Sequence, residues 1–151
     1  MQISNKCYYA LRALFELSLH QAESQPVKIG LIARKQRIPK RFLEVILCEL
    51  RQGDFVESRR GVEGGYFLAR APEQITIGEV IRFVDHDISP VACVSDNQPA
   101  NNCEFNLECP FYDFWMEAKR ALENVYDGTT IQDIVERWQA ISAKNSYNYE
   151  I

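Results

Sequence analysis

Residues 27–68 read VKIGLIARKQRIPKRFLEVILCELRQGDFVESRRGVEGGYFL, and this stretch decides the fold. A short helix is predicted to begin at Ile29 and a turn follows it. Pro39 then suits the first position of a second helix, because its missing N–H costs nothing there. The second helix has apolar side chains at helical spacing. These are Phe42, Leu43, Val45, Ile46 and Leu50. A helix with an apolar back and a polar front, reached by a tight turn, is typical of proteins that read the DNA major groove.

The polar front of this second helix holds the first candidate DNA contacts. Lys40, Arg41 and Glu44 fall opposite the apolar positions, and Cys48 lies near them. Basic side chains can reach phosphates, and a glutamate can accept a hydrogen bond from the amino group of cytosine. We expect Lys40 and Arg41 to position the helix and Glu44 to read bases, whereas Cys48 is interpreted as structural.

Two predicted strands and a glycine-rich turn follow the second helix. Residues 55–58 and 66–69 have the aromatic and β-branched character of strands, and RRGVEGG separates them at 59–65. Arg59 and Arg60 can reach phosphates or a narrow minor groove. Three glycines are expected to supply positive φ angles and to let the backbone approach a partner closely. They are Gly61, Gly64 and Gly65. A solvated hairpin is the alternative, but its place directly after a helix-turn-helix pattern favours a wing.

The charge of the chain is unevenly distributed. The 151 residues are 46% hydrophobic and 25% charged, which predicts one globular core, and their net charge is −4. Residues 1–72 contain 12 Lys and Arg against 7 Asp and Glu, whereas residues 73–151 contain 5 against 14. The basic charge thus lies on the predicted reading head, where attraction to phosphates requires it. Double-stranded DNA is therefore the expected partner despite the negative total.

The sequence lacks the patterns of secreted, membrane and catalytic proteins. Lys6 and Arg12 interrupt the N-terminal apolar positions, so no signal peptide is recognised, and no apolar run is long enough to cross a bilayer. No Ser-His-Asp set, phosphate-binding loop or catalytic pair of carboxylates emerges. We expect a cytoplasmic protein that is not an enzyme and has no membrane partner.

The chain is predicted to contain four segments. Residues 1–84 form the winged helix-turn-helix domain, which includes a capped helix that follows Thr76. Residues 85–109 lose helical periodicity and form a loop of a length that is usually functional or disordered. Residues 110–141 form two C-terminal helices, and residues 142–151 a mobile tail. The expected fold class is mainly α with a small β-hairpin wing.

The long helix after Pro110 is richly apolar. Its apolar side chains repeat at intervals of three and four residues. They are Phe111, Phe114, Trp115, Ala118, Ala121, Leu122 and Val125. A core helix within one subunit is one interpretation. A dimerisation helix is favoured, because palindromic operators match proteins with two-fold symmetry.

Three of the five cysteines fall in the predicted loop. Cys93, Cys103 and Cys109 have nine and five residues between them, and Pro110 and a helix start follow at once. In a reducing cytoplasm, clustered cysteines are more often metal or redox sites than structural disulfides. Thiolates at a positively polarised helix N-terminus can bind an iron–sulfur cluster or zinc. Three reduced thiols and a redox-switching disulfide are the alternatives.

Four blocks of sequence occur in a recognisable order. They are MQISNKCYYALRAL at 1–14, IPKRFLEVILCELRQGDFVESRRGVEGGYFLAR at 38–70, ITIGEVIRFVD at 75–85, and a three-cysteine loop that ends in Cys109-Pro110. Together they resemble the Rrf-two family of bacterial winged-helix transcription factors, over residues 1 to about 135. The resemblance implies a homodimeric DNA-binding repressor or dual regulator, in which the long helix after Cys109 crosses its counterpart.

The resemblance also assigns roles to individual residues. Glu44 matches a recognition-helix glutamate, and Arg60, Gly64 and Gly65 match the wing. Cys93, Cys103 and Cys109 match the ligands of an iron–sulfur cluster in the IscR-like and NsrR-like branch, whereas CymR-like members lack this triad. That branch takes a fourth ligand from positions that are Tyr112 and Tyr8 in this chain, and its first gap is five residues rather than nine. Cys7 is therefore the speculative fourth ligand, reaching across the dimer, but a helix-packing cysteine is the favoured interpretation.

These features predict a transcriptional regulator whose DNA affinity depends on the cluster. Binding of the cluster would order the loop and set the angle between the dimer helix and the reading heads. A metal-free regulator that responds to thiol oxidation or to an effector is the first alternative. A protein-interaction module with an incidental basic surface is the second.

Overall fold

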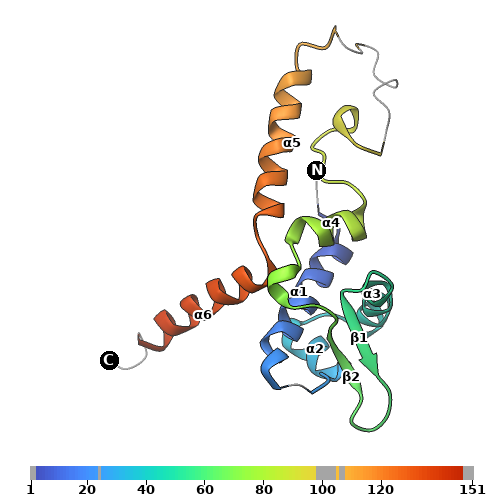
Figure 1. Cartoon of the computed structure of the whole chain (residues 1–151), viewed down its shortest axis with the longest axis vertical. Coiled ribbons are helices and arrows are strands. Elements are labelled where there is room, and N and C mark those ends of the chain that lie inside the picture. Colours follow the sequence, from blue (N-terminus) through green and yellow to red (C-terminus); the bar gives the residue numbers. More distant parts are fainter. Residues whose placement is uncertain (1–2, 24, 98–104, 106–107, 148–151) are drawn as a thin grey trace.

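The computed structural model describes residues 3–23, 25–97, 105 and 108–147. The helices and strands are α1 (Asn5–Leu19), α2 (Ile29–Gln36), α3 (Lys40–Gln52), β1 (Val56–Arg59), β2 (Gly65–Leu68), α4 (Ile77–Asp85), α5 (Tyr112–Asp127) and α6 (Ile131–Tyr147), with the short 3₁₀ helices η1 (Gln21–Glu23), η2 (Pro72–Gln74) and η3 (Ala92–Val94). The first four helices and the hairpin form a body from which α5 rises and α6 runs to one side (Figure 1). The predicted fold class, mainly α with a winged helix-turn-helix, is confirmed.

The central helix α1 is capped by Ser4, and a residue that is distant in the sequence holds this cap in place. The hydroxyl of Ser4 accepts a hydrogen bond from the backbone N–H of Cys7 at 3.0 Å. Asp85, the last residue of α4, accepts hydrogen bonds from both the backbone N–H and the hydroxyl of Ser4. One face of α1 is fully buried, and it consists of Cys7, Ala10, Ala13, Leu14 and Leu17. Helices α2, α3, α4 and α6 all pack against α1.

A left-handed turn joins α2 to α3. Arg37 has φ 52° and ψ 43°, and the N–H of the next residue, Ile38, donates to the carbonyl of Ala33 at 2.9 Å. Ile38 is buried, so the turn is anchored to the core. Pro39 is the N-cap of α3 rather than its first residue, and its carbonyl accepts from Leu43 at 3.1 Å. The helix-turn-helix therefore forms as the sequence predicts.

The buried stripe of α3 is narrower than predicted. Leu43, Ile46, Leu47 and Leu50 are buried, and they follow the spacing of a single helical face. Phe42 and Val45, which we assigned to the packed back, are 63% and 57% exposed. These two side chains fall outside the stripe, because a helix turns about 100° per residue. The prediction for Phe42 and Val45 is therefore wrong.

The wing is an antiparallel hairpin that pairs Val56 with Leu68 and Arg59 with Gly65. Val27 adds a short bridge to Tyr66, through backbone hydrogen bonds of 2.7 and 2.9 Å. Among the wing glycines, positive φ occurs at Gly61 alone, at 107°, so the expected role of the other two is corrected. An added Cβ would strike the carbonyl oxygen of Arg59 at Gly64 and that of Val27 at Gly65. Gly64 thus allows a close approach within the wing, and Gly65 allows the wing to approach the segment before α2.

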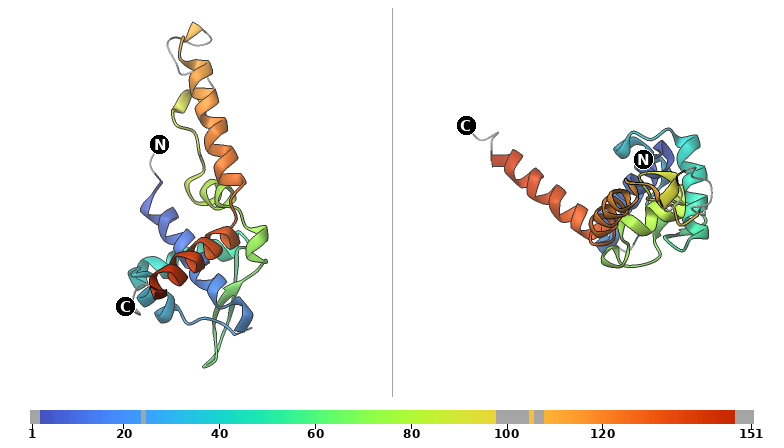
Figure 2. Two further views of the ribbon diagram at one scale, coloured as in Figure 1. Left: turned by 90° about the vertical axis from the view of Figure 1, so that its left-hand side faces the viewer. Right: turned by 90° about the horizontal axis from the view of Figure 1, so that it is seen from above.

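The second half of the chain joins the body at the start of α4. Ile77 donates to the carbonyl of Thr129, and Ile131 donates to that of Ile75, both at 2.9 Å. Ile131, at the start of α6, is buried in the same core as α1. The right-hand view of Figure 2, from above, shows that most of α6 lies away from this body.

The last helix is longer than predicted. We placed its end at residue 141, but α6 continues to Tyr147 and thus includes six residues of the segment expected to be a mobile tail. The physical reason is that no glycine or proline interrupts residues 129–151.

None of the helices in the described part of the chain has the length and hydropathy needed to cross a bilayer.

Replacing Gly65 by alanine tests the close approach within the wing. The new Cβ would lie 2.5 Å from the carbonyl oxygen of Val27, so Gly65→Ala should lower the free energy of unfolding by about 2 kcal/mol. Gly30 lies in α2 with nothing within 4 Å of an added Cβ, so Gly30→Ala should be neutral or stabilising by up to about 1 kcal/mol. Urea denaturation measures both changes. Equal stability of the two variants would contradict the packing of the wing.

Candidate nucleic-acid interface and cysteine sites

The front of α3 is an exposed surface of mixed polarity. Lys40, Arg41 and Glu44 are all exposed, as predicted from their positions. Phe42 and Val45 lie on the same helix and are also exposed. Such apolar side chains can contact the methyl group of thymine, while Glu44 can accept from cytosine. The front of α3 can therefore combine phosphate contacts with contacts to base edges.

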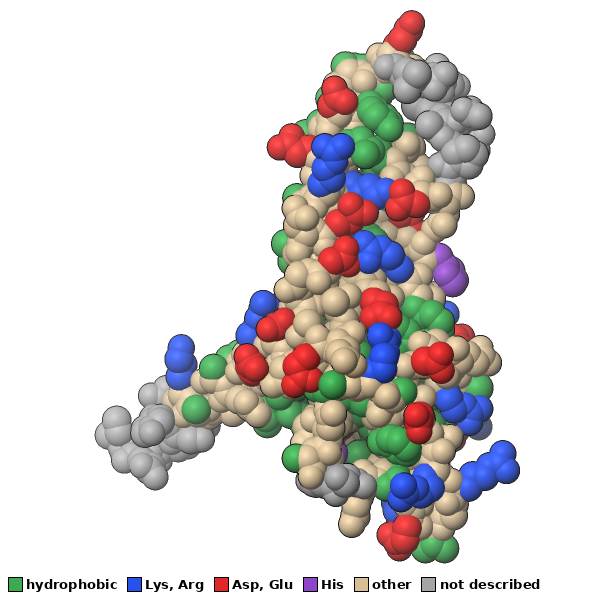
Figure 3. Space-filling view, in the orientation of Figure 1, with side chains coloured by type: hydrophobic (Ala, Val, Ile, Leu, Met, Phe, Trp, Pro, Cys, Tyr) green, Lys and Arg blue, Asp and Glu red, His purple; other side chains and the backbone are tan. Residues whose placement is uncertain are grey.

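A basic groove lies between the wing and the helices beside it. It has a volume of about 440 Å³, and its charged lining residues are Lys28, Arg51, Arg59 and Arg60. Among the residues that the structure describes, no acidic side chain lines it. The two wing arginines are exposed, and Arg51 donates a hydrogen bond to the hydroxyl of Ser58 at 3.2 Å. In the view of Figure 3, basic side chains gather at the lower right, over α3 and the wing, with some acidic ones among them, and side chains of both signs alternate along α5.

Sequence reasoning missed two members of this groove, Lys28 and Arg51. Lys28 is the N-cap of α2, and Arg51 lies in the last turn of α3. Their link to the wing depends on the hairpin folding back beside α3, which no local pattern shows. The bridge between Val27 and Tyr66, which draws the start of α2 to β2, is the contact that places Lys28 there.

The two described cysteines of the loop both lie beside α5. Cys93 is part of η3, which packs against α5, and Cys109 accepts a hydrogen bond on its carbonyl from the N–H of Tyr112, the first residue of α5. Both residues are half-buried. Cys103 lies outside the described residues. No group of three His, Cys, Asp or Glu with the arrangement of a metal site occurs among residues 3–23, 25–97, 105 and 108–147.

The other two cysteines have different environments, one in the core and one on the surface. Cys7 is fully buried in the core, and burial, with a smaller contribution from Asp85, raises the pKa of its thiol to about 12. A metal ligand must be a thiolate, so this environment argues against Cys7 as the fourth ligand and favours a packing role. Cys48 is exposed on α3, so its interpretation as structural is wrong. Position 48 lies outside the buried stripe, for the same geometric reason as Phe42 and Val45.

Polar contacts stabilise the segment that directly follows α4. This segment, residues 86–97, contains Cys93 and is called the Cys93 arm below. The hydroxyl of Ser89 donates to the carbonyl of Val94 at 3.1 Å, and Asp87 accepts from the N–H of Ser89 at 2.8 Å. Burial tends to raise the pKa of Asp87, but hydrogen bonds from Ser95 and Ser89 outweigh it and hold that pKa below its usual value. The Cys93 arm therefore has an ordered structure of its own.

Comparisons with known proteins agree with this arrangement. The family model described as "Rrf2: Iron-dependent Transcriptional regulator" matches residues 3–137. The transcriptional regulator CymR of Bacillus subtilis is 33% identical over 134 residues, which cover 89% of each chain. The regulator IscR of Cronobacter sakazakii is 28% identical over 150 residues, which cover 99% of this chain and 90% of that one.

Solved structures show the same relationship. CymR of B. subtilis, called a global cysteine regulator, has a TM-score of 0.75 at 31% identity and covers 91% of this chain and 98% of its own. IscR of T. potens has a TM-score of 0.71 at 29% identity and covers 91% and 88%. The chain therefore belongs to the Rrf2 family, the Rrf-two family that its sequence resembles, and is a helix-turn-helix transcriptional regulator.

Proposed function

We propose that this regulator binds double-stranded DNA in the cytoplasm, with α3 in the major groove and the wing on the adjacent backbone. The observation that carries the proposal is the basic groove beside an exposed α3. Four cationic side chains line that groove, and no acidic one does. Phosphate attraction depends on such local charge, so the net charge of −4 does not oppose binding.

Individual contacts follow from the chemistry of the side chains. Arg59, Arg60 and Arg51 suit phosphates or a narrow minor groove, because guanidinium groups are planar and remain charged. Lys40 and Arg41, in the first turn of α3, suit phosphates at the edge of the major groove. Glu44 is positioned to select bases rather than to add affinity, since it repels phosphates. Gly64 and Gly65 support the shape of the wing and are not assigned a DNA contact of their own.

The assembly that we propose is a homodimer formed through α5. Lys119 is the only buried side chain of this helix, whereas Phe111, Phe114 and Val125 are 62%, 57% and 62% exposed. Apolar side chains left exposed along one long helix favour burial against another protein surface. A second copy of the same chain satisfies this need and places two reading heads on a palindromic site.

We further propose that the thiols of Cys93, Cys103 and Cys109 control DNA binding by holding an iron–sulfur cluster. The family is described as iron-dependent, and relatives named IscR cover nearly the whole chain. Cys93 and Cys109 are half-buried beside α5, which suits ligands that must be thiolates yet protected from water. When bound, such a cluster supplies sensitivity to oxidation and to iron supply. The chain itself supplies the cysteine loop and the helix α5, which would respond to the state of the cluster.

A second candidate function is a metal-free regulator of sulfur metabolism that responds to thiol oxidation. The similarity to CymR, called a global cysteine regulator, supports it. The exposed thiol of Cys48 on the front of α3 also favours it, because oxidation there would change the DNA-binding surface directly.

Salt dependence tests the DNA interface. Arg60→Ala and Arg51→Ala should each weaken DNA binding and reduce the slope of log K against log salt by about one, since each removes one phosphate contact. Lys144→Ala, which removes an exposed charge from α6, is the matched control and should leave the slope unchanged. Glu44→Gln should change sequence preference rather than the slope. Fluorescence anisotropy with labelled duplexes measures these effects, and wild-type slopes for both arginine variants would refute the groove assignment.

A charge placed on α5 tests the homodimer. Phe114→Asp should convert a dimer into a monomer, because an unpaired carboxylate cannot be buried in an apolar interface. Phe114 is 57% exposed in the single chain, so the fold itself should persist. Glu117→Gln, at an exposed position of the same helix, is the control. Light scattering after size-exclusion chromatography gives the masses. A monomeric wild-type protein at micromolar concentration would contradict the assembly.

Anaerobic purification separates the two candidate functions. The cluster predicts a coloured protein with visible absorption and stoichiometric iron and sulfide, and its loss in Cys93→Ser and Cys109→Ser. Cys48→Ser should keep the colour, because this residue lies on α3 rather than in the loop. A colourless wild-type protein without iron after anaerobic reconstitution would overturn the cluster and favour the metal-free regulator.

A further inference from the structure

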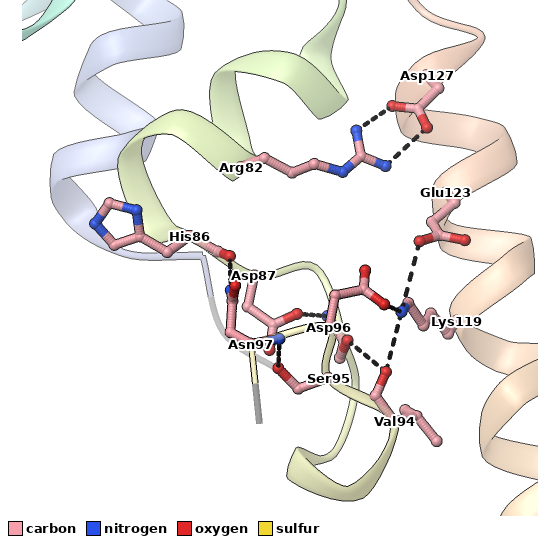
Figure 4. A network of polar contacts seen from close by, with 11 residues as sticks. Arg82, His86, Asp87, Val94, Ser95, Asp96, Asn97, Lys119, Glu123 and Asp127 are labelled. Atoms are coloured by element: carbon pink, nitrogen blue, oxygen red, sulfur yellow. Dashed lines mark hydrogen bonds and ion pairs between the residues drawn. The ribbon is translucent and has the colours of Figure 1, made fainter. Parts of the chain in front are cut away.

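The Cys93 arm is attached to α5 by one buried ammonium group. The Nζ atom of Lys119 donates to the carbonyl oxygen of Val94 at 3.0 Å and to the carboxylate of Asp96 at 2.6 Å (Figure 4). Glu123 lies one turn further along α5, with its carboxylate 3.9 Å from the same nitrogen. The contact to Val94 holds the residue directly after Cys93. The position of the Cys93 backbone is therefore tied to α5.

Burial of this ammonium group needs an explanation. Lys119 is 6% exposed, although lysine is among the residues least often buried. Burying a charge is costly unless it is paired and hydrogen-bonded, and an apolar side chain would pack η3 against α5 without that cost. A lysine at this position fixes how the two elements pack, because its buried nitrogen must lie where a carbonyl and a carboxylate can both accept from it. Both acceptors belong to the Cys93 arm.

The far end of α5 is clasped to α4. Arg82 donates to both carboxylate oxygens of Asp127, at 2.6 and 2.8 Å, and this hydrogen bonding holds the pKa of Asp127 below its usual value. Gly78 on α4 lies so close to Asp127 that an added Cβ would collide with the carboxylate. Lys119 and Asp127 are eight residues apart on one helix. A rigid element thus connects the Cys93 arm with α4.

From α4 the contacts continue to the reading head. Glu79 pairs with Arg70 at 2.8 Å, and Arg70 also donates to the carbonyl of Asp54, just beyond the end of α3, at 3.3 Å. Polar contacts and packed helices therefore run from the cysteine loop to the base of the wing.

We infer that Lys119 is a positioning residue that docks the Cys93 arm on α5, and that the Arg82–Asp127 pair passes a change in the loop to α4 and the DNA-binding surface. This inference deepens the proposed function and rests on its DNA-binding part. It does not require that the loop thiols hold a metal.

The docking step is tested by the reactivity of Cys93. Iodoacetamide labelling of the reduced protein, followed by peptide mapping, gives the rate at Cys93, and exposed Cys48 serves as the internal reference. Lys119→Met should raise the Cys93 rate about tenfold, because the arm opens more often without its charged hydrogen bonds. Asp96→Asn, at a side chain that is 79% exposed, should give a smaller rise without risk to the fold. Arg120→Met removes an exposed charge from the next position and should keep the wild-type rate. Wild-type rates in both Lys119→Met and Asp96→Asn would overturn the docking role.

The transmission step is tested by DNA affinity without any metal. In a Cys48→Ser background, the Kd for a duplex selected by binding is measured before and after the loop thiols are alkylated. The ratio of the two Kd values should differ from one in the Cys48→Ser parent protein. It should lie closer to one when Lys119→Met or Arg82→Met is added to that protein. A ratio of one in the parent, or an unchanged ratio in both variants, would overturn transmission. Failure of the cluster is read separately, as absence of iron and sulfide from the reconstituted protein.

Discussion

The buried face of α1 is the constraint on which the rest of the structure depends. Its five fully buried residues include Ala10 and Ala13, whose small side chains let neighbouring helices come close. Four helices pack against α1, so the positions of α3 and α4 both follow from it. Glu16 lies on the same helix at 3% exposure and accepts from Gln36 at 2.6 Å, which fixes α2 against α1. A buried carboxylate must keep its hydrogen-bond donors, so this contact restricts the register of the two helices.

The two halves of the molecule meet around α4 and where α6 packs against α1. Backbone hydrogen bonds join the segments before α4 and before α6, and the Arg82–Asp127 pair joins α4 to α5. Lys119 is the only buried residue of α5, which packs against α4 and η3, whereas the reading head has a full core. A helix with so few buried residues can change its angle without unfolding either half. This division suits a protein in which events at a loop alter the spacing of two DNA-binding surfaces.

The fold was predictable wherever local chemistry decides it. Periodic apolar residues, Pro39 and the Thr76 cap define α2, α3 and α4, and Thr76 indeed accepts from the N–H of Glu79 at 3.1 Å. Exposure of Phe42 and Val45 was not predictable in the same way, because an apolar side chain on the front of a reading helix looks like a core residue in the sequence. The roles of Gly64 and Gly65 depend on backbone segments that meet only in three dimensions.

The candidate sites were predictable to a lesser degree. Exposure of Arg59 and Arg60 followed from a polar turn, but Lys28 and Arg51 join them only because the hairpin folds back beside two helices. The sequence shows Cys93 and Cys109 as neighbours of a helix start, yet nothing local indicates that Lys119 reaches back to the Cys93 arm. Its partners are 23 and 25 residues away, and a lysine in an amphipathic helix is normally solvated.

The cap of α1 has a consequence for how the chain folds. Ser4 and Asp85 are separated by 81 residues, and the core also contains Ile131. Several residues that contact the first helix are therefore synthesised much later than the helix itself. Contacts between distant parts of a chain slow folding, because loop closure must precede their benefit. During synthesis α2 and α3 can cover part of the nascent first helix, but the rest of its apolar face stays uncovered until α4 emerges. We therefore expect chains truncated before α4 to aggregate, because the reading head is built around its earliest segment.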